Sequence, residues 1–348
     1  MRKVRSAEYK PLTEGLYALH DGPLVKPDSV DAIIFDVDGV LVEVSGSFRQ
    51  VISLTVQHYF NRVLNVPGEA RLLTAEETGL FKLAGDFNND WDLSKGAVAF
   101  CLMKQICSGN GSSDTAAIRN AAPSLEEFTS LVGRLGGGLG NAVDYAREQL
   151  DDTGRTRFDS EYRPELIKRI FMEYYAGPGL SEELYGIRAE HYDGPGLIEQ
   201  EVFLLNLSLI ERLQKDGLKF GILSGRTPGE AAYLFRKQGL DKLLEPEFIL
   251  TDDGGLPGKP NPAGLALLAR RMEFAGAIYV GDVPDDWATV LRYRSEHPEL
   301  PPVAGCMVST GAVSHGILDR YIEGERVDYL AADVNHLLSA VNDFRRGV

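Results

Sequence analysis

The sequence predicts an α/β fold, in which a parallel β-sheet covered by helices is interrupted by a large helical insertion. Short apolar runs rich in branched residues occur at 33–35, 219–224, 247–251, 277–281 and 303–308. Helix start signals stand between the later runs. Strands that alternate with helices form parallel sheets buried on both faces, so residues 31–45 and 200–348 are expected to share one sheet.

The helix start signals follow from residue chemistry. Thr227 is expected to cap a helix that begins at Pro228, with Glu230 completing a capping box. Asn261 and Pro262 repeat this pattern before the next apolar stretch. Proline suits the first helical position because the N–H it lacks would have no partner inside the helix.

Residues 46–199 show helical spacing and no clear strand alternation. Apolar residues recur with helical spacing from position 48 to 63, and a second apolar stripe covers 164–175. Capping boxes, TAEE at 74–77 and SLEE at 124–127, precede further helices. These patterns predict a helical domain inserted after the first strand. Residues 1–30 form an N-terminal extension with no assigned role.

The insertion also contains a glycine-rich segment, GRLGGGLG, at 133–140. A phosphate-binding loop would follow a strand and open a helix, whereas this segment follows a predicted helix. A mobile loop is the favoured interpretation.

Composition excludes several classes of partner. The net charge of −15 and the pI near 4.9 argue against nucleic acid and anionic membranes, which require concentrated Lys and Arg. No apolar run approaches the ~20 residues of a membrane helix, and no signal peptide is indicated. Three scattered cysteines suggest no disulfide framework, so the cytoplasm is the expected location. Anionic substrates remain compatible, because a bound divalent cation can reverse the local field.

Two aspartates follow the first predicted strand. The run 32–35 leads into Asp36 and Asp38, and Gly39 then allows the backbone to turn sharply. Strand alternation would point both carboxylates the same way, at the edge where open α/β sheets place their sites. For this stretch taken alone, an Asx-type turn is the alternative interpretation.

Three further polar features follow later strands. Ser224 opens a helix whose N–H groups suit an anion, although a simple helix cap is the alternative. Lys259 lies between Gly and Pro on a constrained loop, where a solvated lysine is the alternative. Asp282, Asp285 and Asp286 would repel one another unless a cation or hydrogen bonds compensate. A structural alternative exists for Asp285 and Asp286, because acidic residues in the first turn of a helix interact favourably with the helix dipole.

The order of these features resembles the haloacid dehalogenase superfamily. Asp-x-Asp-Gly, Ser, Lys and Gly-Asp-x-x-Asp-Asp each follow a separate strand, as in subfamily I members with a C1 helical cap, such as phosphoglycolate phosphatases and phosphomutases. The resemblance covers 31–45 and 200–348 and implies a Rossmann-like core, with 46–199 as the cap domain. It implies a magnesium-dependent phosphatase acting on a small phosphorylated metabolite, such as a sugar phosphate or a phosphorylated carboxylic acid.

The resemblance also implies roles for the matched residues. Asp36 would be the nucleophile that forms an aspartyl-phosphate, and Asp38 would act as general acid and then as general base. The implied Mg²⁺ ligands are Asp36, Asp38 through its carbonyl, Asp282 and Asp286, with Asp285 as a further candidate. The implied phosphate-binding residues are Asp36, Ser224, Gly225 and Lys259.

Substrate contacts are expected from a polar and aromatic cluster at 85–96 in the insertion. The candidates are Asn88, Asn89, Asp90 and Trp91, together with Arg226 of the core. The alternative is structural: Asp90 or Asp92 caps the next helix, and Trp91 belongs to the core of the insertion.

Two alternatives to a phosphatase stay open. A phosphomutase of the same family would share the nucleophile and the acid/base residue. A phospho-acceptor signalling module also groups acids, a Ser or Thr and a Lys around magnesium, but such modules are shorter and place the acidic pair before the acceptor aspartate. The sequence does not indicate the oligomeric state.

Overall fold

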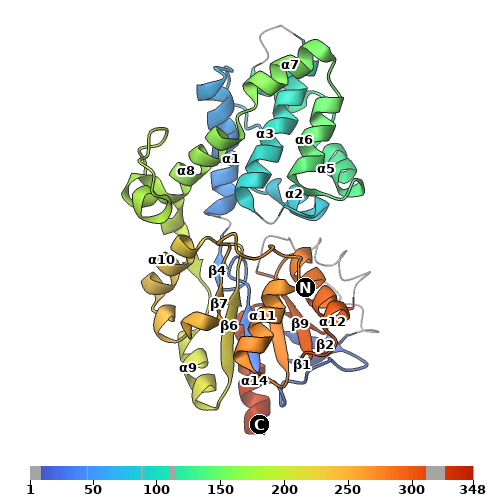
Figure 1. Cartoon of the computed structure of the whole chain (residues 1–348), viewed down its shortest axis with the longest axis vertical. Helices are drawn as coiled ribbons and strands as arrows, with labels where there is room; N and C mark the ends of the chain where they lie inside the picture. Colours follow the sequence, from blue (N-terminus) through green and yellow to red (C-terminus); the bar gives the residue numbers. More distant parts are fainter. Residues whose placement is uncertain (1–8, 45, 88, 110–113, 311–325, 348) are drawn as a thin grey trace. The chain divides into compact units, whose positions relative to one another are not determined.

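The computed structural model describes residues 9–44, 46–87, 89–109, 114–310 and 326–347. The chain divides into two compact units, coloured by sequence in Figure 1. The core unit consists of Met1–Val44 and Val202–Val348, and the inserted unit is Ser45–Glu201.

The core unit contains an eight-stranded sheet in the order β1-β2-β10-β9-β8-β3-β6-β7. Its strands are β1 (Tyr9–Thr13), β2 (Leu16–Leu19), β3 (Ala32–Phe35), β6 (Lys219–Leu223), β7 (Ile249–Leu250), β8 (Ala277–Gly281), β9 (Val303–Val308) and β10 (Tyr329–Ala331). All strands from β10 to β7 run parallel. The predicted parallel sheet is therefore confirmed, with β3 between β6 and β8.

The N-terminal segment adds two strands that the sequence did not predict. Strand β2 pairs antiparallel with both β10 and β1, so the sheet is mixed at this edge. The outermost strand, β1, carries Lys10 and Pro11. A charge and a proline are tolerated at a sheet edge, where they discourage pairing with another chain.

Helices cover both faces of this sheet. They are α9 (Leu207–Lys215), α10 (Pro228–Gln238), α11 (Ala263–Met272), α12 (Pro284–Glu296) and α14 (Val334–Arg346), with 3₁₀ turns at Leu240–Lys242 and Pro246–Phe248. Ile34 shares a buried cluster with Leu268 of α11 and Trp287 of α12. The neighbouring residues Ile33 and Phe35 point to the opposite face. The capping box of Thr227 and Glu230 is present, as predicted.

A short ladder flanks the boundary between the two units. Strand β4 (Val42–Glu43) pairs antiparallel with β5 (Val202–Phe203), with Val42 opposite Phe203 and Glu43 opposite Val202. The chain therefore leaves and re-enters the core unit at two adjacent positions.

The regular secondary structure of the inserted unit is helical in the residues described. Its helices are α1 (Phe48–His58), a π-helical turn (Tyr59–Val63), α2 (Thr78–Ala84), α3 (Asp90–Cys107), α4 (Thr115–Asn120), α5 (Leu125–Arg134), α6 (Gly138–Glu148), α7 (Asp152–Glu161), α8 (Pro164–Tyr185) and a 3₁₀ turn (Leu197–Gln200). Helix α3 contacts α1, α6, α7 and α8. The capping box of Ser124 and Glu127 begins α5, as predicted. None of the helices in the described ranges has the length and apolarity to cross a bilayer.

The glycine-rich segment is a tight turn between α5 and α6, and not the loose loop expected from its composition. Gly137 has a φ of +75°, and a Cβ there would lie 2.3 Å from the carbonyl oxygen of Gly85. The glycines are needed because the backbone turns in the left-handed region while it touches another segment.

Candidate active site

Polar residues gather where parallel strands of the core unit end. Asp36 follows β3, Ser224 follows β6, and Asp282 follows β8. The backbone N–H of Asp36 donates to the carbonyl of Val280, 2.9 Å away, so the ladder between β3 and β8 holds this residue in place. The carboxyl ends of parallel strands meet at one edge, which is where open α/β sheets bind ligands.

Three buried carboxylates and one lysine form the centre of this edge. Carboxylate oxygens of Asp36, Asp282 and Asp286 lie within 4.8 Å of one another. Lys259 Nζ lies 2.9 Å from Asp36 Oδ1 and 2.7 Å from Asp286 Oδ1. Side-chain exposure is 10% for Lys259, 7% for Asp36 and 0% for Asp286. One ammonium does not balance three carboxylates, so the cluster favours an additional cation.

Asp286 holds its neighbours in this cluster in place through four hydrogen bonds. Its Oδ1 accepts hydrogen bonds from Lys259 Nζ at 2.7 Å and from the hydroxyl of Tyr279 at 2.8 Å. Its Oδ2 accepts the backbone N–H groups of Asp282 and Val283, at 3.0 and 3.1 Å. A carboxylate has about four acceptor positions, and here two bind the loop after β8 while two bind the side chains of Lys259 and Tyr279. The sequence interpretation did not include Tyr279.

Burial and charge shift the pKa values in the cluster. Burial raises the pKa of Asp36 to about 7, against the lowering effect of the Lys259 charge. Burial lowers the pKa of Lys259, but Asp286 and Asp36 outweigh it and hold that pKa well above its usual value. Lys259 therefore carries its positive charge next to Asp36.

The donor set of the cluster suits a hard divalent cation. All of the grouped ligand atoms are carboxylate oxygens, and Mg²⁺ is bound in proteins through one or two carboxylates together with substrate phosphates. Both oxygens of Asp286 already accept two hydrogen bonds each, so direct coordination of a cation by this carboxylate would have to compete with them.

A second ion pair involves Asp38 and Arg226. Arg226 Nε and Nη2 lie 2.8 and 2.6 Å from Asp38 Oδ1. The arginine side chain is fully buried, whereas that of Asp38 is 29% exposed. The backbone N–H of Arg226 also donates to Ser224 Oγ at 3.2 Å, and Gly225 between them is exposed. The structure thus joins the motif after β3 to the motif after β6.

The turn after Asp38 is fixed by the backbone. Gly39 has a φ of +77°, and its N–H donates to the carbonyl of Val42 at 2.8 Å. Its own carbonyl accepts a hydrogen bond from Thr310 Oγ1 at 2.7 Å. Glycine is needed at this position because a side chain would strain the left-handed conformation.

The substrate-binding candidates of the inserted unit have structural contacts within that unit. Asn88 lies outside the described residues. Asn89 caps α3, because its side chain accepts the backbone N–H groups of Trp91 and Asp92 at 3.0 and 3.2 Å. A cap at this position agrees with the structural alternative, although Asn89 supplies it and not Asp90 or Asp92.

Asp90 and Trp91 also have partners on neighbouring helices. Asp90 pairs with Lys82 of α2 at 2.9 Å. Lys168 Nζ lies 4.2 Å from the centre of the Trp91 ring, and Phe171 meets that ring edge-on. Contact of these residues with a substrate stays a prediction.

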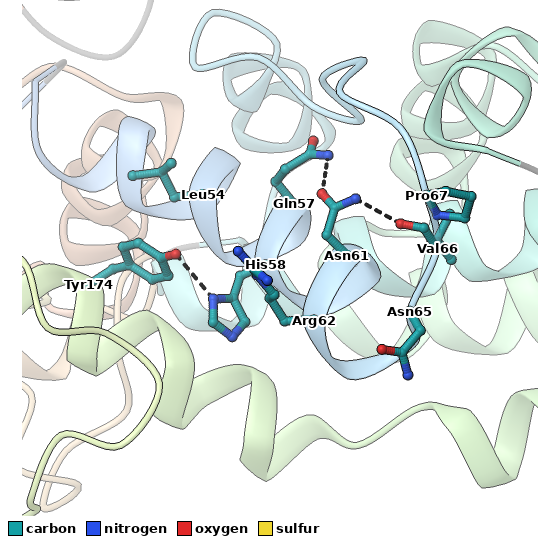
Figure 2. A pocket seen from close by; sticks show the side chains of 9 residues that line it. All are labelled: Leu54, Gln57, His58, Asn61, Arg62, Asn65, Val66, Pro67 and Tyr174. Atoms are coloured by element: carbon teal, nitrogen blue, oxygen red, sulfur yellow. Dashed lines mark hydrogen bonds between the residues drawn. The ribbon is translucent and has the colours of Figure 1, made fainter.

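The inserted unit has a pocket of its own, shown in Figure 2. It is lined by Leu54, Gln57, His58, Asn61, Arg62, Asn65, Val66, Pro67 and Tyr174. Several of its polar groups bind one another: Gln57 Nε2 donates to Asn61 Oδ1 at 2.6 Å, and Asn61 Nδ2 donates to the carbonyl of Val66 at 2.8 Å. The hydroxyl of Tyr174 lies 3.1 Å from His58 Nδ1. None of the carboxylates of the cluster lines this pocket.

Two titratable groups of this pocket, His58 and Tyr174, have shifted pKa values, and burial raises the pKa of Tyr174. The pKa of His58 shifts the other way. Burial lowers its pKa, and the charges of His191 and Arg62 lower it further, against Glu173. The imidazole is therefore held in its neutral form more strongly than in the unfolded chain.

Comparison with known proteins identifies the family. The family model described as "haloacid dehalogenase-like hydrolase" matches residues 30–290, a range that includes both ion-paired motifs and the carboxylate cluster. The chain belongs to the haloacid dehalogenase-like hydrolases. The resemblance inferred from the four motifs is therefore confirmed, and this hydrolase is an enzyme.

Individual relatives of this haloacid dehalogenase-like hydrolase are distant. It is 28% identical over 257 residues to imidazoleglycerol-phosphate dehydratase from Phytophthora nicotianae, an alignment that covers 74% of this chain and 40% of that protein. A crystal structure from the Northeast Structural Genomics Consortium has 19% identity and a TM-score of 0.58, with 92% of this chain and 100% of that chain covered. Phosphatase Tt82 from Thermococcus thioreducens has 22% identity and a TM-score of 0.50, with 84% and 100% covered. The two structures show that the fold is shared.

Proposed function

We propose that this hydrolase is a magnesium-dependent phosphatase that cleaves a small phosphomonoester through an aspartyl-phosphate intermediate. The observation that supports it best is the buried Asp36 carboxylate, held 2.9 Å from Lys259 beside two further carboxylates. Phosphoryl transfer depends mainly on positioning and on positive charge around the transferred group, and this edge of the sheet offers both.

The chemistry assigns one role to each side chain. Asp36 attacks phosphorus while the bond to the leaving oxygen breaks, and Asp38 donates a proton to that oxygen. Asp38 then accepts a proton from the water that attacks phosphorus, which breaks the acyl-phosphate bond and releases phosphate and free Asp36. Lys259, Ser224 and the backbone N–H of Gly225 hold the phosphoryl oxygens.

The metal that would act here is Mg²⁺, bound by the carboxylates of Asp36 and Asp282 and the carbonyl of Asp38. When bound, it would neutralise the charge of the phosphoryl group and offset the repulsion among the carboxylates. Asp286 would support this site by orienting Lys259 and the backbone of Asp282.

The substrate class follows from the inserted unit, which we propose acts as a cap domain. Chemistry under a lid suits a small phosphorylated metabolite, because closure excludes water from the reacting atoms. Sugar phosphates and phosphorylated carboxylic acids are the first candidates. The dehydratase relative is named for imidazoleglycerol phosphate, so phosphomonoesters with an imidazole ring belong in the same panel.

The test is release of inorganic phosphate from such a panel and from p-nitrophenyl phosphate, with Mg²⁺ and with excess EDTA. Activity should require Mg²⁺, and Asp36→Asn should abolish it. Asp241→Asn, which changes an exposed aspartate in a 3₁₀ turn of the same unit, should leave the rate unchanged.

Two results would contradict the proposal. Absence of phosphate release from every compound with Mg²⁺ would refute a phosphatase. Activity that appears only when a catalytic bisphosphate is added, with isomerised substrate as the product, would assign this chain to the phosphomutases.

A further inference from the structure

We infer that Arg226 is a positioning residue that orients Asp38 for proton transfer to the leaving group. This inference rests on the proposed function and assigns Arg226 a role at Asp38, where the sequence suggested substrate binding. The two residues are 188 positions apart in the chain. They come from the ends of adjacent strands, β3 and β6.

Both hydrogen bonds that the structure describes between these two side chains end on one oxygen of Asp38. Its Nε and Nη2 donate to Oδ1 at 2.8 and 2.6 Å. Neither of these two hydrogen bonds ends on the other oxygen, Oδ2. A guanidinium is planar and always charged, so two of its donors on one oxygen hold that oxygen of the carboxylate in place. General acid catalysis depends on this geometry, because the proton must be within hydrogen-bond reach of the leaving oxygen.

The arginine is itself held on several sides. Its side chain is fully buried, its backbone N–H donates to Ser224 Oγ at 3.2 Å, and its carbonyl accepts the N–H of Asp252 at 2.8 Å. Thr227, the next residue, caps α10. The guanidinium therefore approaches Asp38 from a rigid segment, which keeps the entropic cost of positioning low.

If Arg226 positions the general acid, the loss of activity on replacing Arg226 should depend on the leaving group of the substrate. An alkoxide leaves slowly without a proton, so an alkyl phosphate requires Asp38 in the correct orientation. A nitrophenolate leaves readily as an anion and needs this proton much less. A role of Arg226 in binding the phosphoryl group would instead affect both substrates equally, because both contain the same group.

The experiment compares Arg226→Gln and Arg226→Lys with the wild type on p-nitrophenyl phosphate and on an alkyl phosphomonoester that the wild type hydrolyses. The parameter is kcat/KM, which reports the steps up to formation of the aspartyl-phosphate. Arg236→Gln makes the same change at an exposed position of α10 and is the matched control. Thermal unfolding of each variant checks that the fold is intact.

For Arg226→Gln we expect kcat/KM to fall about 100-fold or more with the alkyl phosphate and less than about 10-fold with p-nitrophenyl phosphate. Arg226→Lys keeps the charge but not the planar pair of donors, so its selective loss should be intermediate. If Arg226→Gln does not fold, the lysine variant decides the question by the same ratio.

Equal losses on the two substrates, or no loss on either, would overturn the positioning role while leaving the phosphatase proposal intact. A wild type inactive on both substrates would instead overturn the proposed function, and this inference with it.

Discussion

Replacing Asp286 with asparagine changes a buried carboxylate that accepts four hydrogen bonds into an amide that accepts at only one end. The amide oxygen can serve either the backbone N–H groups of Asp282 and Val283 or the pair formed by Lys259 and Tyr279. The first orientation costs less, because the Tyr279 hydroxyl can rotate and accept from the new NH₂ group. Lys259 then faces a donor and loses its ion pair with residue 286.

The magnitude follows from that lost ion pair. Removing one partner of a buried pair costs about 3–5 kcal/mol. Lys259 keeps its contact with Asp36 at 2.9 Å, which places the expected loss at the lower end. We therefore expect Asp286→Asn to lower the free energy of unfolding by about 3 kcal/mol.

Urea unfolding in EDTA, followed by tryptophan fluorescence, measures this change without any contribution from bound metal. Trp287 is the residue next to Asp286 and is 2% exposed, so its emission reports on α12. The second tryptophan, Trp91, lies in the inserted unit and can be replaced by phenylalanine in all proteins compared.

Asp285→Asn is the matched control, because it changes the adjacent aspartate in the first turn of the same helix. We expect it to cost less than about 1 kcal/mol, the usual size of a helix-dipole effect. If Asp286→Asn were as stable as Asp285→Asn, Asp286 would not hold its neighbours in the cluster in place, and the hydrogen-bond argument would be wrong.

Two predictions concern the inserted unit. Gly137→Ala should lower the free energy of unfolding in urea by about 2–4 kcal/mol, because the new Cβ would strain a left-handed backbone and clash with Gly85. Gly140→Ala in α6 is the control and should be neutral or stabilising, because a Cβ there meets nothing within 4 Å. The lowered pKa of His58 means that the unfolded chain binds its proton more tightly, so stability should fall as pH drops below the ordinary value of 6.5. His58→Gln should weaken the dependence of the melting temperature on pH below 6.5. An unchanged slope would show that other groups cause the dependence.

The parts of the molecule that the sequence predicted are those with a local signal. Buried strands such as β3 and β8 appear as short apolar runs, and the caps of α5 and α10 appear as fixed residue spacings. The acids Asp36 and Asp282 could be proposed because charge at the end of an apolar strand requires an explanation.

The parts that it did not predict depend on partners distant in the sequence or on exceptions to the residue pattern. The Arg226 guanidinium finds its acceptor 188 residues away, and the hydroxyl of Tyr279 lies in a strand that otherwise appears purely apolar. The hydroxyl of a tyrosine in an otherwise apolar strand was the signal that could have identified Tyr279. Strand β1 was missed because Lys10 and Pro11 lower its strand propensity, which only an edge position tolerates.

The ladder between β4 and β5 has a consequence for engineering this chain. Glu43 and Val202 face each other across it, although 157 residues of the inserted unit separate the two strands in sequence. A two-residue Asn-Gly turn is the length that closes an antiparallel pair into a β-hairpin. Replacement of residues 44–201 by such a turn would therefore join Glu43 to Val202 through two residues and leave the sheet topology unbroken, so the insertion can be regarded as a removable module.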